Sequence, residues 1–204
     1  LEVLRLLGIG QYAIVITHID RVKSPRVAQV TEVLQSVMGM QWPVFEVNNI
    51  DGSGVDDLKR YLLQMAEEQS AKSREGYFRL SIDRSFLLNG IGLVATGTAI
   101  SGSVSEGDKL FLLPGNREVR VRAIHSQNQK SATGQAGQRC ALQLAGIEKS
   151  QINRGDWLHA STQTQVSNRL NVRLEISDRL FFKVKHLCPV KLYIGAKLQP
   201  AKLY

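Results

Sequence analysis

The stretch from Tyr77 to Leu113 constrains the fold of this sequence more than any other part. It contains three β-rich runs, over residues 77–86, 93–100 and 103–113, which are separated by glycine-containing turns. Short strands punctuated in this way are typical of a small antiparallel barrel. In the first run, Phe78, Leu80 and Ile82 alternate with polar residues and therefore share one face of a strand.

Arg84 breaks this alternation. It falls on the same parity as the apolar residues, where an arginine requires either a charged partner or an exposed rim. Its neighbour in the sequence is Asp83. The misplaced charge beside a carboxylate is the first indication of a functional site.

The chain beyond residue 113 continues the β pattern. A turn is expected at residues 114–116, a strand at 118–125, a polar loop at 127–135, a strand at 137–145, and a turn at 153–156 leading into Trp157. The strand at 118–125 should point Val119, Val121 and Ala123 inward. After a linker at 161–167, a further β segment is expected at 169–175, where Leu170, Val172 and Leu174 alternate.

Residues 1–70 have a different pattern. Two apolar runs, at 12–17 and 44–47, are typical of buried parallel strands. The helix after the first run should start at Ser24 and Pro25, end at Gly39, and bury Val27, Val30, Leu34 and Val37. A helix after the second run should bury Val55, Leu58, Leu62 and Met65. This order predicts an α/β sheet, and we expect three domains, at 1–70, 77–162 and 167–204.

Composition excludes several classes of protein. No apolar run is long enough for a membrane-spanning helix and no secretory signal is visible, so we expect a cytoplasmic protein without a membrane partner. Cys140 and Cys188 are expected to be reduced core thiols, in preference to a disulfide. His125 and His159 have no metal-ligand spacing, so we expect no metal site and give them structural roles. We identify no catalytic residue.

The net charge of +8 is unevenly distributed along the chain. Residues 1–70 carry 6 basic and 9 acidic side chains, residues 71–160 carry 12 and 7, and residues 161–204 carry 8 and 2. An acidic head and a basic body indicate a polyanionic partner for the later parts, or simply a solvated basic surface.

Polar residues follow both strands of the predicted α/β sheet. Thr17, His18 and Asp20 come after the first strand, and Asn48 and Asn49 come after the second. Ligands of open parallel sheets bind at the carboxyl ends of strands, and a carboxylate there can accept from both N–H edges of a guanine ring. The alternative is a loop followed by an ordinary helix cap.

These phrases together resemble a known family. Thr17-His18-Ile19-Asp20 resembles the Thr-Lys-x-Asp guanine-specificity motif of translational GTPases, with His18 in place of lysine. Val47-Asn48-Asn49 is similar to their last nucleotide motif, and residues 78–86 and 92–98 to the opening of their second domain. Residues 82–86, 125–129, 136–139 and 151–158 fit the bacterial selenocysteine-specific elongation factors better than elongation factor Tu.

The resemblance implies the α/β C-terminal part of a P-loop GTPase domain, followed by an all-β antiparallel barrel and the start of a second β domain. The Gly-x-x-x-x-Gly-Lys-Ser/Thr phosphate loop is not in this sequence. We therefore expect an internal fragment that does not hydrolyse GTP alone. The implied cofactor is GTP, with Mg²⁺ ligands outside the fragment, and Thr17, His18, Asp20, Asn48 and Asn49 near the base.

The resemblance also implies that Asp83, Arg84 and Arg139 form a selenocysteine pocket. Two guanidiniums favour a selenolate over a neutral serine hydroxyl, and Asp83 can orient one of them. The alternative is a set of surface ion pairs. The implied function is GTP-dependent delivery of selenocysteinyl-tRNA to the ribosome, with an mRNA selenocysteine insertion element read by further C-terminal domains. Two other functions remain open: another translational GTPase, of elongation factor Tu or initiation factor type, and a non-enzymatic β-barrel binding module.

Overall fold

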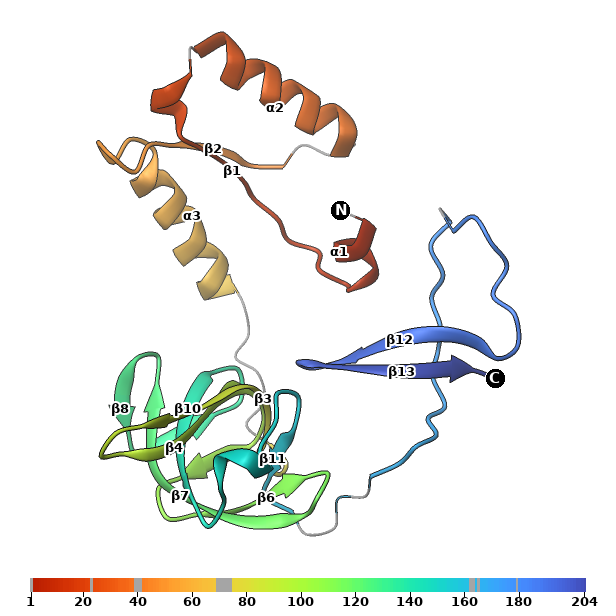
Figure 1. Ribbon diagram of the computed structural model, residues 1–204. Helices are drawn as coiled ribbons and strands as arrows, with labels where there is room; N and C mark the ends of the chain where they lie inside the picture. Colours follow the sequence, from red (N-terminus) through yellow and green to blue (C-terminus); the bar gives the residue numbers. More distant parts are fainter. Residues whose placement is uncertain are drawn as a thin grey trace. The chain divides into compact units, whose positions relative to one another are not determined.

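The computed structural model describes residues 2–22, 24–38, 42–68, 75–161, 164, 166–178 and 180–204. The chain divides into two compact units, one of residues 1–70 with 173–181 and the other of residues 71–172 with 182–204 (Figure 1). The predicted helix end at Gly39 and parts of both predicted linkers lie outside the described residues. The three domain boundaries expected from the sequence stay a prediction.

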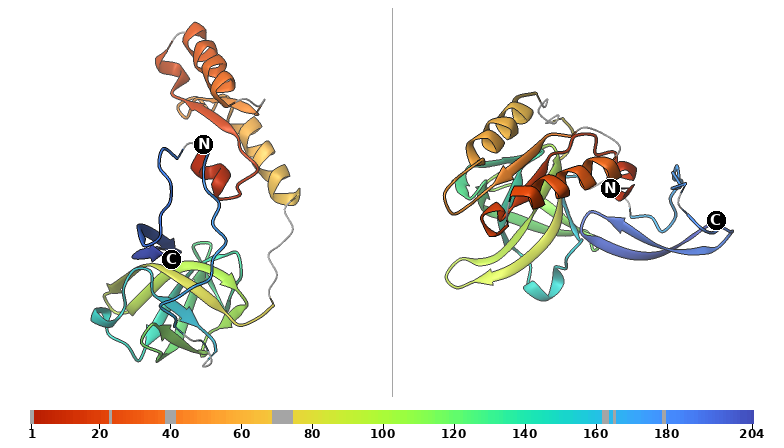
Figure 2. Two further views of the ribbon diagram at one scale, coloured as in Figure 1. Left: turned by 90° about the vertical axis from the view of Figure 1, so that its right-hand side faces the viewer. Right: turned by 90° about the horizontal axis from the view of Figure 1, so that it is seen from above.

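The first unit has the predicted α/β order. Its elements are α1 (Glu2–Leu6), β1 (Ile14–Thr17), the 3-10 helix η1 (Ile19–Arg21), α2 (Ser24–Met38), β2 (Val44–Val47) and α3 (Val55–Glu68). Strands β1 and β2 are parallel, with Ile14 opposite Val44 and Thr17 opposite Val47. Helices α2 and α3 lie on opposite sides of this pair (Figures 1 and 2). The two strands therefore end at the same edge, which places their following loops side by side.

Two expectations about burial in this unit are wrong. The strand β1 is not buried, and Val15 is 40% exposed, because β2 is its sole strand partner among the described residues. Leu62 of α3 is 54% exposed. Its neighbour Tyr61 faces the sheet instead and packs on Phe45, with ring centroids 5.1 Å apart. Val55, Leu58 and Met65 are half-buried, so the predicted face is right except that Tyr61 takes the place of Leu62.

The second unit contains the antiparallel barrel. Its main strands are β3 (Arg79–Leu88), β4 (Gly92–Ser101), β6 (Lys109–Leu113), β7 (Arg117–Ser126), β8 (Gln129–Ser131), β10 (Arg139–Ala145) and β11 (Trp157–His159). They are ordered β10-β4-β3-β11-β6-β7-β8, and β10 also pairs with β7, which closes the ring (Figures 1 and 2). A small pair of strands, β5 (Ser103–Ser105) and β9 (Thr133–Gln135), and a 3-10 helix, η2 (Lys149–Gln151), complete the barrel.

The predicted inward face of the first barrel strand is confirmed. Phe78, Leu80 and Ile82 are at most 1% exposed and join a closed apolar core. Burying a side chain of this size contributes about 1.5–3 kcal/mol each. This core fixes the barrel and leaves the outer faces of its strands for binding.

A β-bulge at Asp83 explains the misplaced charge at Arg84. Ile82 is opposite Gly97 and Arg84 is opposite Thr96, so Asp83 is the extra residue of β3. A bulge shifts the alternation by one residue and moves Arg84 to the outer face, with Thr96. The close approach of the strands requires glycine at 97, because a Cβ there would lie 2.0 Å from the Ser81 carbonyl oxygen.

A second bulge overturns the predicted inward position of Ala123. Gln143 of β10 pairs with Ala123 but Leu144 pairs with Val121, so Arg122 is the extra residue of β7. The inward alternation therefore resumes at Ile124, which is 0% exposed, whereas Ala123 is half-buried on the other face.

The sequence predicted a polar loop at residues 127–135. This prediction is wrong, because the stretch contains β8 and β9. Gln127 and Asn128 both have positive φ, at 52° and 63°, between the paired residues Ser126 and Gln129. Two central residues with positive φ form the tight turn that suits a twisted hairpin. The sequence signal was missed because Gln-Asn is an unusual pair at these positions.

The strand expected at 169–175 is also absent from the described residues. Leu170, Val172 and Leu174 are 53–63% exposed and have no strand partner there, and alternation without a partner does not form a strand. The C-terminal β structure is instead a hairpin of β12 (Cys188–Ile194) and β13 (Lys197–Leu203), which starts with Cys188 opposite Leu203. None of the described helices has the length and apolarity to cross a membrane.

Candidate functional site

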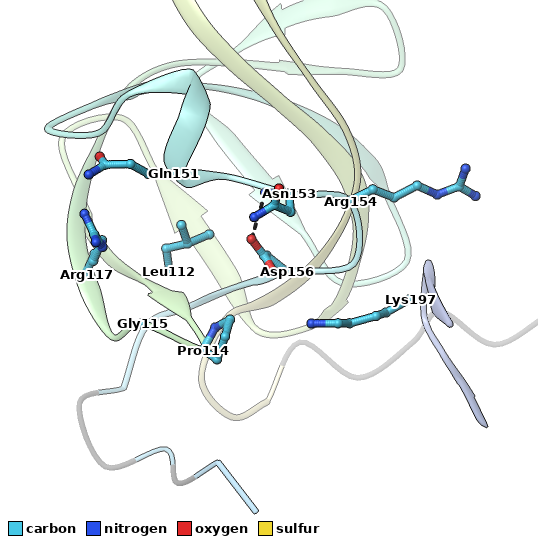
Figure 3. A pocket seen from close by; sticks show the side chains of 9 residues that line it. All are labelled: Leu112, Pro114, Gly115, Arg117, Gln151, Asn153, Arg154, Asp156 and Lys197. Atoms are coloured by element: carbon cyan, nitrogen blue, oxygen red, sulfur yellow. Dashed lines mark hydrogen bonds between the residues drawn. The ribbon is translucent and has the colours of Figure 1, made fainter. Parts of the chain in front are cut away.

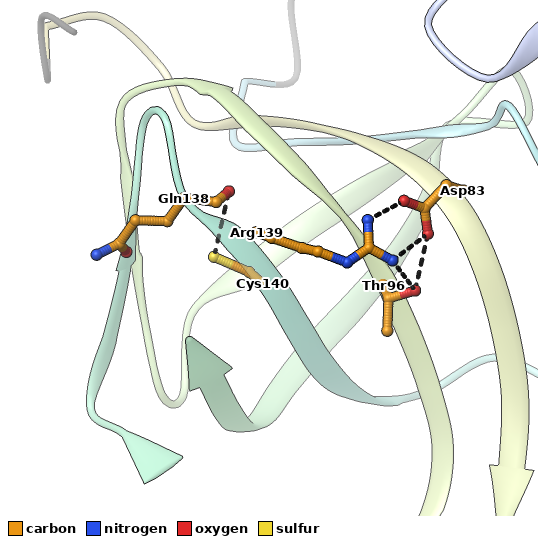
Figure 4. Close-up of polar contacts among 5 residues, drawn as sticks. All are labelled: Asp83, Thr96, Gln138, Arg139 and Cys140. Carbon is orange, nitrogen blue, oxygen red and sulfur yellow. Dashed lines mark hydrogen bonds and ion pairs between the residues drawn. The ribbon is translucent and has the colours of Figure 1, made fainter. Parts of the chain in front are cut away.

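Asp83 and Arg139 form an ion pair on the outside of the barrel (Figure 4). Arg139 donates through Nη1 to Oδ2 of Asp83 and through Nη2 to Oδ1, the second bond being 3.0 Å long. The pairing is therefore bidentate, the arrangement in which guanidinium and carboxylate planes match best. The two residues are 56 positions apart in the sequence, and the bulge in β3 turns Asp83 toward its partner.

Thr96 of β4 is the third member of this cluster. Its hydroxyl donates to Oδ1 of Asp83 at 2.8 Å and accepts a longer bond of 3.4 Å from Nη2 of Arg139. Figure 4 shows the three side chains converging from three strands. Every oxygen of the Asp83 carboxylate thus has a donor.

These contacts set the electrostatics of the cluster. The hydrogen bond from Arg139 lowers the pKa of Asp83 below its ordinary value, against the opposing effect of partial burial, and the Thr96 hydroxyl lowers it further. The side chains of Arg139 and Asp83 remain 55% and 27% exposed. Solvent therefore screens the pair, and its net stabilisation should stay under about 1 kcal/mol.

Of the two options that the sequence left open for Arg84, a charged partner or an exposed position, the structure has the exposed position. Arg84 makes no hydrogen bond or ion pair with any other described residue. Its charge still helps to lower the pKa of neighbouring Asp83. Because Arg84 is opposite Thr96 in the strand register, the two side chains share the outer face. The site thus contains one arginine without a carboxylate partner, Arg84, and one that is paired with Asp83, Arg139.

A cavity of about 700 Å³ opens next to this cluster. Thr96 and Arg139 belong to its lining. The apolar lining residues include Phe86, Leu88, Ile91 and Val94, and the polar ones include His125, Gln127, Asn128, Lys130 and Gln143. A mostly apolar hollow with a few placed polar groups is the usual form of a small-ligand site.

Cys140 and His159 take structural positions, as expected. Cys140 is a free thiol, 1% exposed, and burial raises its pKa. Burial also lowers the pKa of His159, whose Nδ1 accepts from the Ser161 amide at 2.8 Å. His125 is exposed at the rim of the cavity. The part of the chain that the structure describes contains no cluster of three metal-ligating side chains.

A second cavity, of about 480 Å³, lies at the turn before β11 (Figure 3). Arg117, Arg154 and Lys197 bring three cations to its lining. Asp156, which is 4% exposed, accepts from the Asn153 amide at 2.8 Å and holds the turn. In Figure 3 the Arg154 guanidinium points away from the other lining residues, and the lining also carries the Asp156 carboxylate, so the three cations do not converge on one point.

The residues suggested for guanine recognition lie together at the shared edge of β1 and β2. Thr17 ends β1 opposite Val47, and Asn48 and Asn49 follow β2 directly. Asp20 lies in η1 and is exposed, and His18 has a left-handed backbone with φ 59°. Asn48 is 6% exposed, and its Oδ1 already accepts from the Ile50 amide at 3.0 Å. Asn48 therefore stabilises the loop. Asp20 and Asn49 are exposed, and their side chains are accessible to a ligand.

The sequence of this chain is similar to those of known elongation factors. The family model of elongation factor Tu domain 2 matches residues 92–159. The selenocysteine-specific elongation factor of Escherichia coli K12 is 44% identical over 180 residues, which are 86% of this chain and 29% of that protein. The one from Haemophilus influenzae is 34% identical over all of this chain and 32% of its own length. The chain is a homologue of part of the selenocysteine-specific elongation factors.

Solved structures of selenocysteine-specific elongation factors agree with this. Translation elongation factor SelB from Methanococcus maripaludis, in its apo form, superposes with a TM-score of 0.87 over 98% of this chain and 44% of that one, at 26% identity. A bacterial selenocysteine-specific elongation factor gives 0.83 over 98% of this chain and 34% of that one, at 25% identity. The antiparallel barrel predicted from the glycine-punctuated runs is confirmed, and its residues 92–159 are the part that matches elongation factor Tu domain 2.

The chain spans about a third of the length of the curated selenocysteine-specific elongation factors that it matches. Sequence reasoning named Asp83 and Arg139 correctly as neighbours, but missed Thr96 and the cavity. The available signal was a hydroxyl residue, Thr96, directly after the apolar residues 93–95 of a predicted strand. The cavity had no signal, because its lining comes from strands distant in the sequence.

Proposed function

We propose that this chain is the part of a GTP-dependent elongation factor that holds the aminoacyl end of selenocysteinyl-tRNA for delivery to the ribosome. The observation that carries the proposal is the pairing state of the two arginines. Arg139 is neutralised by Asp83, while Arg84 stands unpaired one residue further along β3. The cavity that Thr96 and Arg139 help to line has the size and the apolar side chains that suit the end of an aminoacylated nucleotide.

The chemistry of the amino acid explains selectivity at such a site. Selenocysteine is ionised at neutral pH, whereas the hydroxyl of serine is not. An unpaired guanidinium binds the anion with a charge-assisted hydrogen bond, which contributes about 1.5–3 kcal/mol. Seryl-tRNA would leave Arg84 without that partner, so serine would be held less tightly.

The first unit supplies the guanine side of a GTP site in this proposal. Asp20 is accessible at the edge where β1 and β2 end, and a carboxylate there accepts from the N–H groups of guanine. When bound, GTP supplies the energy and the timing of delivery. In this proposal the phosphates and Mg²⁺ are bound by residues other than those of this chain.

Protection of the aminoacyl ester in the full-length protein with GTP tests this function. We expect selenocysteinyl-tRNA to hydrolyse much more slowly when bound and seryl-tRNA to be protected far less. Arg84→Ala should weaken selenocysteinyl-tRNA binding about tenfold to a hundredfold, the equivalent of 1.5–3 kcal/mol. Arg120→Ala, which removes an exposed arginine of β7 outside the cavity lining, is the matched control and should change binding little.

Equal protection of both aminoacyl-tRNAs, unaffected by Arg84→Ala and Arg139→Ala, would contradict the proposal. Protection of the standard aminoacyl-tRNAs would instead assign the chain to a general elongation factor. A full-length protein that binds neither GTP nor tRNA would favour a non-enzymatic binding module.

A further inference from the structure

The Asp83–Arg139 ion pair crosses a strand that contains neither of the two residues. Asp83 is on β3 and Arg139 is on β10, and β4 lies between these two strands in the sheet. Thr96 is the β4 residue opposite both Arg84 of β3 and Ala141 of β10. Its hydroxyl therefore lies next to the ion pair, where the pair crosses β4, and bonds both members.

The hydrogen-bonding capacity of a hydroxyl fixes the direction of each contact. Thr96 has one O–H to donate, and Asp83 as a carboxylate can only accept, so the proton of Thr96 is directed to Oδ1. The remaining lone pairs of Thr96 accept from Nη2 of Arg139. The Thr96 side chain thus bonds both Asp83 and Arg139, and it keeps the Asp83 carboxylate directed toward Arg139.

Asp83 has a second cation within reach of its charge. Arg84 follows it directly in the chain, is unpaired, and helps to lower the pKa of the same carboxyl group. A carboxylate free to rotate would divide its time between the two guanidiniums. Any time that Asp83 spends on Arg84 neutralises the cation that an anionic ligand requires.

We propose that Thr96 is a positioning residue of this site, which binds Asp83 to Arg139 and thereby keeps Arg84 free for the anionic side chain of the aminoacyl ligand. This inference rests on the proposed function. It assigns the discrimination between a charged and a neutral amino acid to the direction in which Asp83 points, and not to the presence of the two arginines alone.

Valine is the appropriate replacement to test this. Thr96→Val keeps the β-branched shape and removes the hydroxyl, whereas Thr96→Ser keeps the hydroxyl and removes the methyl group. Thr98→Val is the matched control, because Thr98 is on the same strand and face, opposite Arg139, and its hydroxyl makes no hydrogen bond to another described residue. Thr96→Ala is a second hydroxyl-free variant that keeps the test valid if valine disturbs folding.

The measurement is the ratio of the dissociation constants of seryl-tRNA and selenocysteinyl-tRNA, in the full-length protein with GTP. We expect Thr96→Val to lower this preference for selenocysteine by five- to fiftyfold. Thr96→Ser and Thr98→Val should stay within twofold of wild type. A second readout is the ¹³C chemical shift of the Asp83 carboxyl group over an acid titration, assigned with Asp83→Asn. Its pKa should rise in Thr96→Val and return in Thr96→Ser.

The outcomes separate this inference from the proposed function. A wild-type preference that survives unchanged in both hydroxyl-free variants would overturn the role of Thr96 while leaving the proposed function in place. A wild-type protein without any preference would overturn the proposed function. In that case the carboxyl titration still decides whether Thr96 positions Asp83, and an unshifted pKa in Thr96→Val would overturn that as well.

Discussion

The guanidinium of Arg139 reaches the carboxylate of Asp83 across an intervening strand, so that one side-chain pair links β10 to β3 over β4. The backbone makes this possible by inserting Asp83 as the extra residue of a bulge. Bulges often redirect a side chain toward a site. Here the bulge accounts both for the ion pair and for the unpaired Arg84 beside it.

The ion pair should make the stability of the barrel depend on pH in the acid range. The lowered pKa of Asp83 means that its contribution is complete above the ordinary value of 3.8 and is lost as the pH falls through the lower value of the folded state. Asp83→Asn should therefore cost under about 1 kcal/mol near neutral pH, since the pair is partly exposed. This difference should vanish in strong acid. Urea unfolding followed by Trp157 fluorescence, in a Trp42→Phe background, measures it.

Glu106→Gln is the control for this experiment, because Glu106 is an exposed carboxylate of the same barrel whose side chain bonds no other described residue. It should show no such difference. A cost of Asp83→Asn that grows as the pH falls would contradict the assignment.

Gly97 should tolerate no side chain. The Cβ of an alanine there would lie 2.0 Å from the Ser81 carbonyl oxygen and 2.7 Å from Cδ2 of Leu80, so β3 and β4 would have to separate at the bulge. We expect Gly97→Ala to destabilise the barrel by about 3 kcal/mol or more. In Gly115→Ala the nearest atoms belong to the flexible Arg117 side chain, at 3.5 Å, so its effect should stay within about 0.5 kcal/mol. Similar unfolding curves for both variants would show that the bulge is not this tight.

The two cysteines should differ in reactivity. Cys140 is 1% exposed and its pKa is raised by burial, so little thiolate is available and little of it is accessible. Cys188 is partly exposed and lies outside the barrel core, so the expectation of a core thiol was wrong for this residue. In the native chain, iodoacetamide should modify Cys188 first and Cys140 only when the barrel opens, as measured by peptide mass spectrometry over time. Equal rates without denaturant would contradict the closed core around Cys140.

The sequence was sufficient for the barrel, because glycine turns and alternating apolar residues act locally. It also drew attention to the candidate site, since Arg84 violated the alternation. The sequence did not reveal the register in which the strands pair. One extra residue at Asp83 and another at Arg122 reverse the faces that follow them, and the residue types alone do not reveal these insertions.

Two other errors have tertiary causes. Residues 129–135 form strands because a tight turn at Gln127 and Asn128 brings them onto existing strands, although their side chains are polar. Residues 169–175 alternate well yet have no partner among the described strands. Strand formation depends on the neighbour as much as on the pattern.

The most direct test of the account is the position of selenium in the full-length protein bound to GTP and selenocysteinyl-tRNA. In a crystal of protein with ordinary methionine, the anomalous signal at the selenium edge marks that single side chain. We expect an anomalous peak in contact with the Arg84 guanidinium and beside the intact Asp83–Arg139 pair. A peak elsewhere, or one with Arg84 turned away from it, would contradict the assignment of this site.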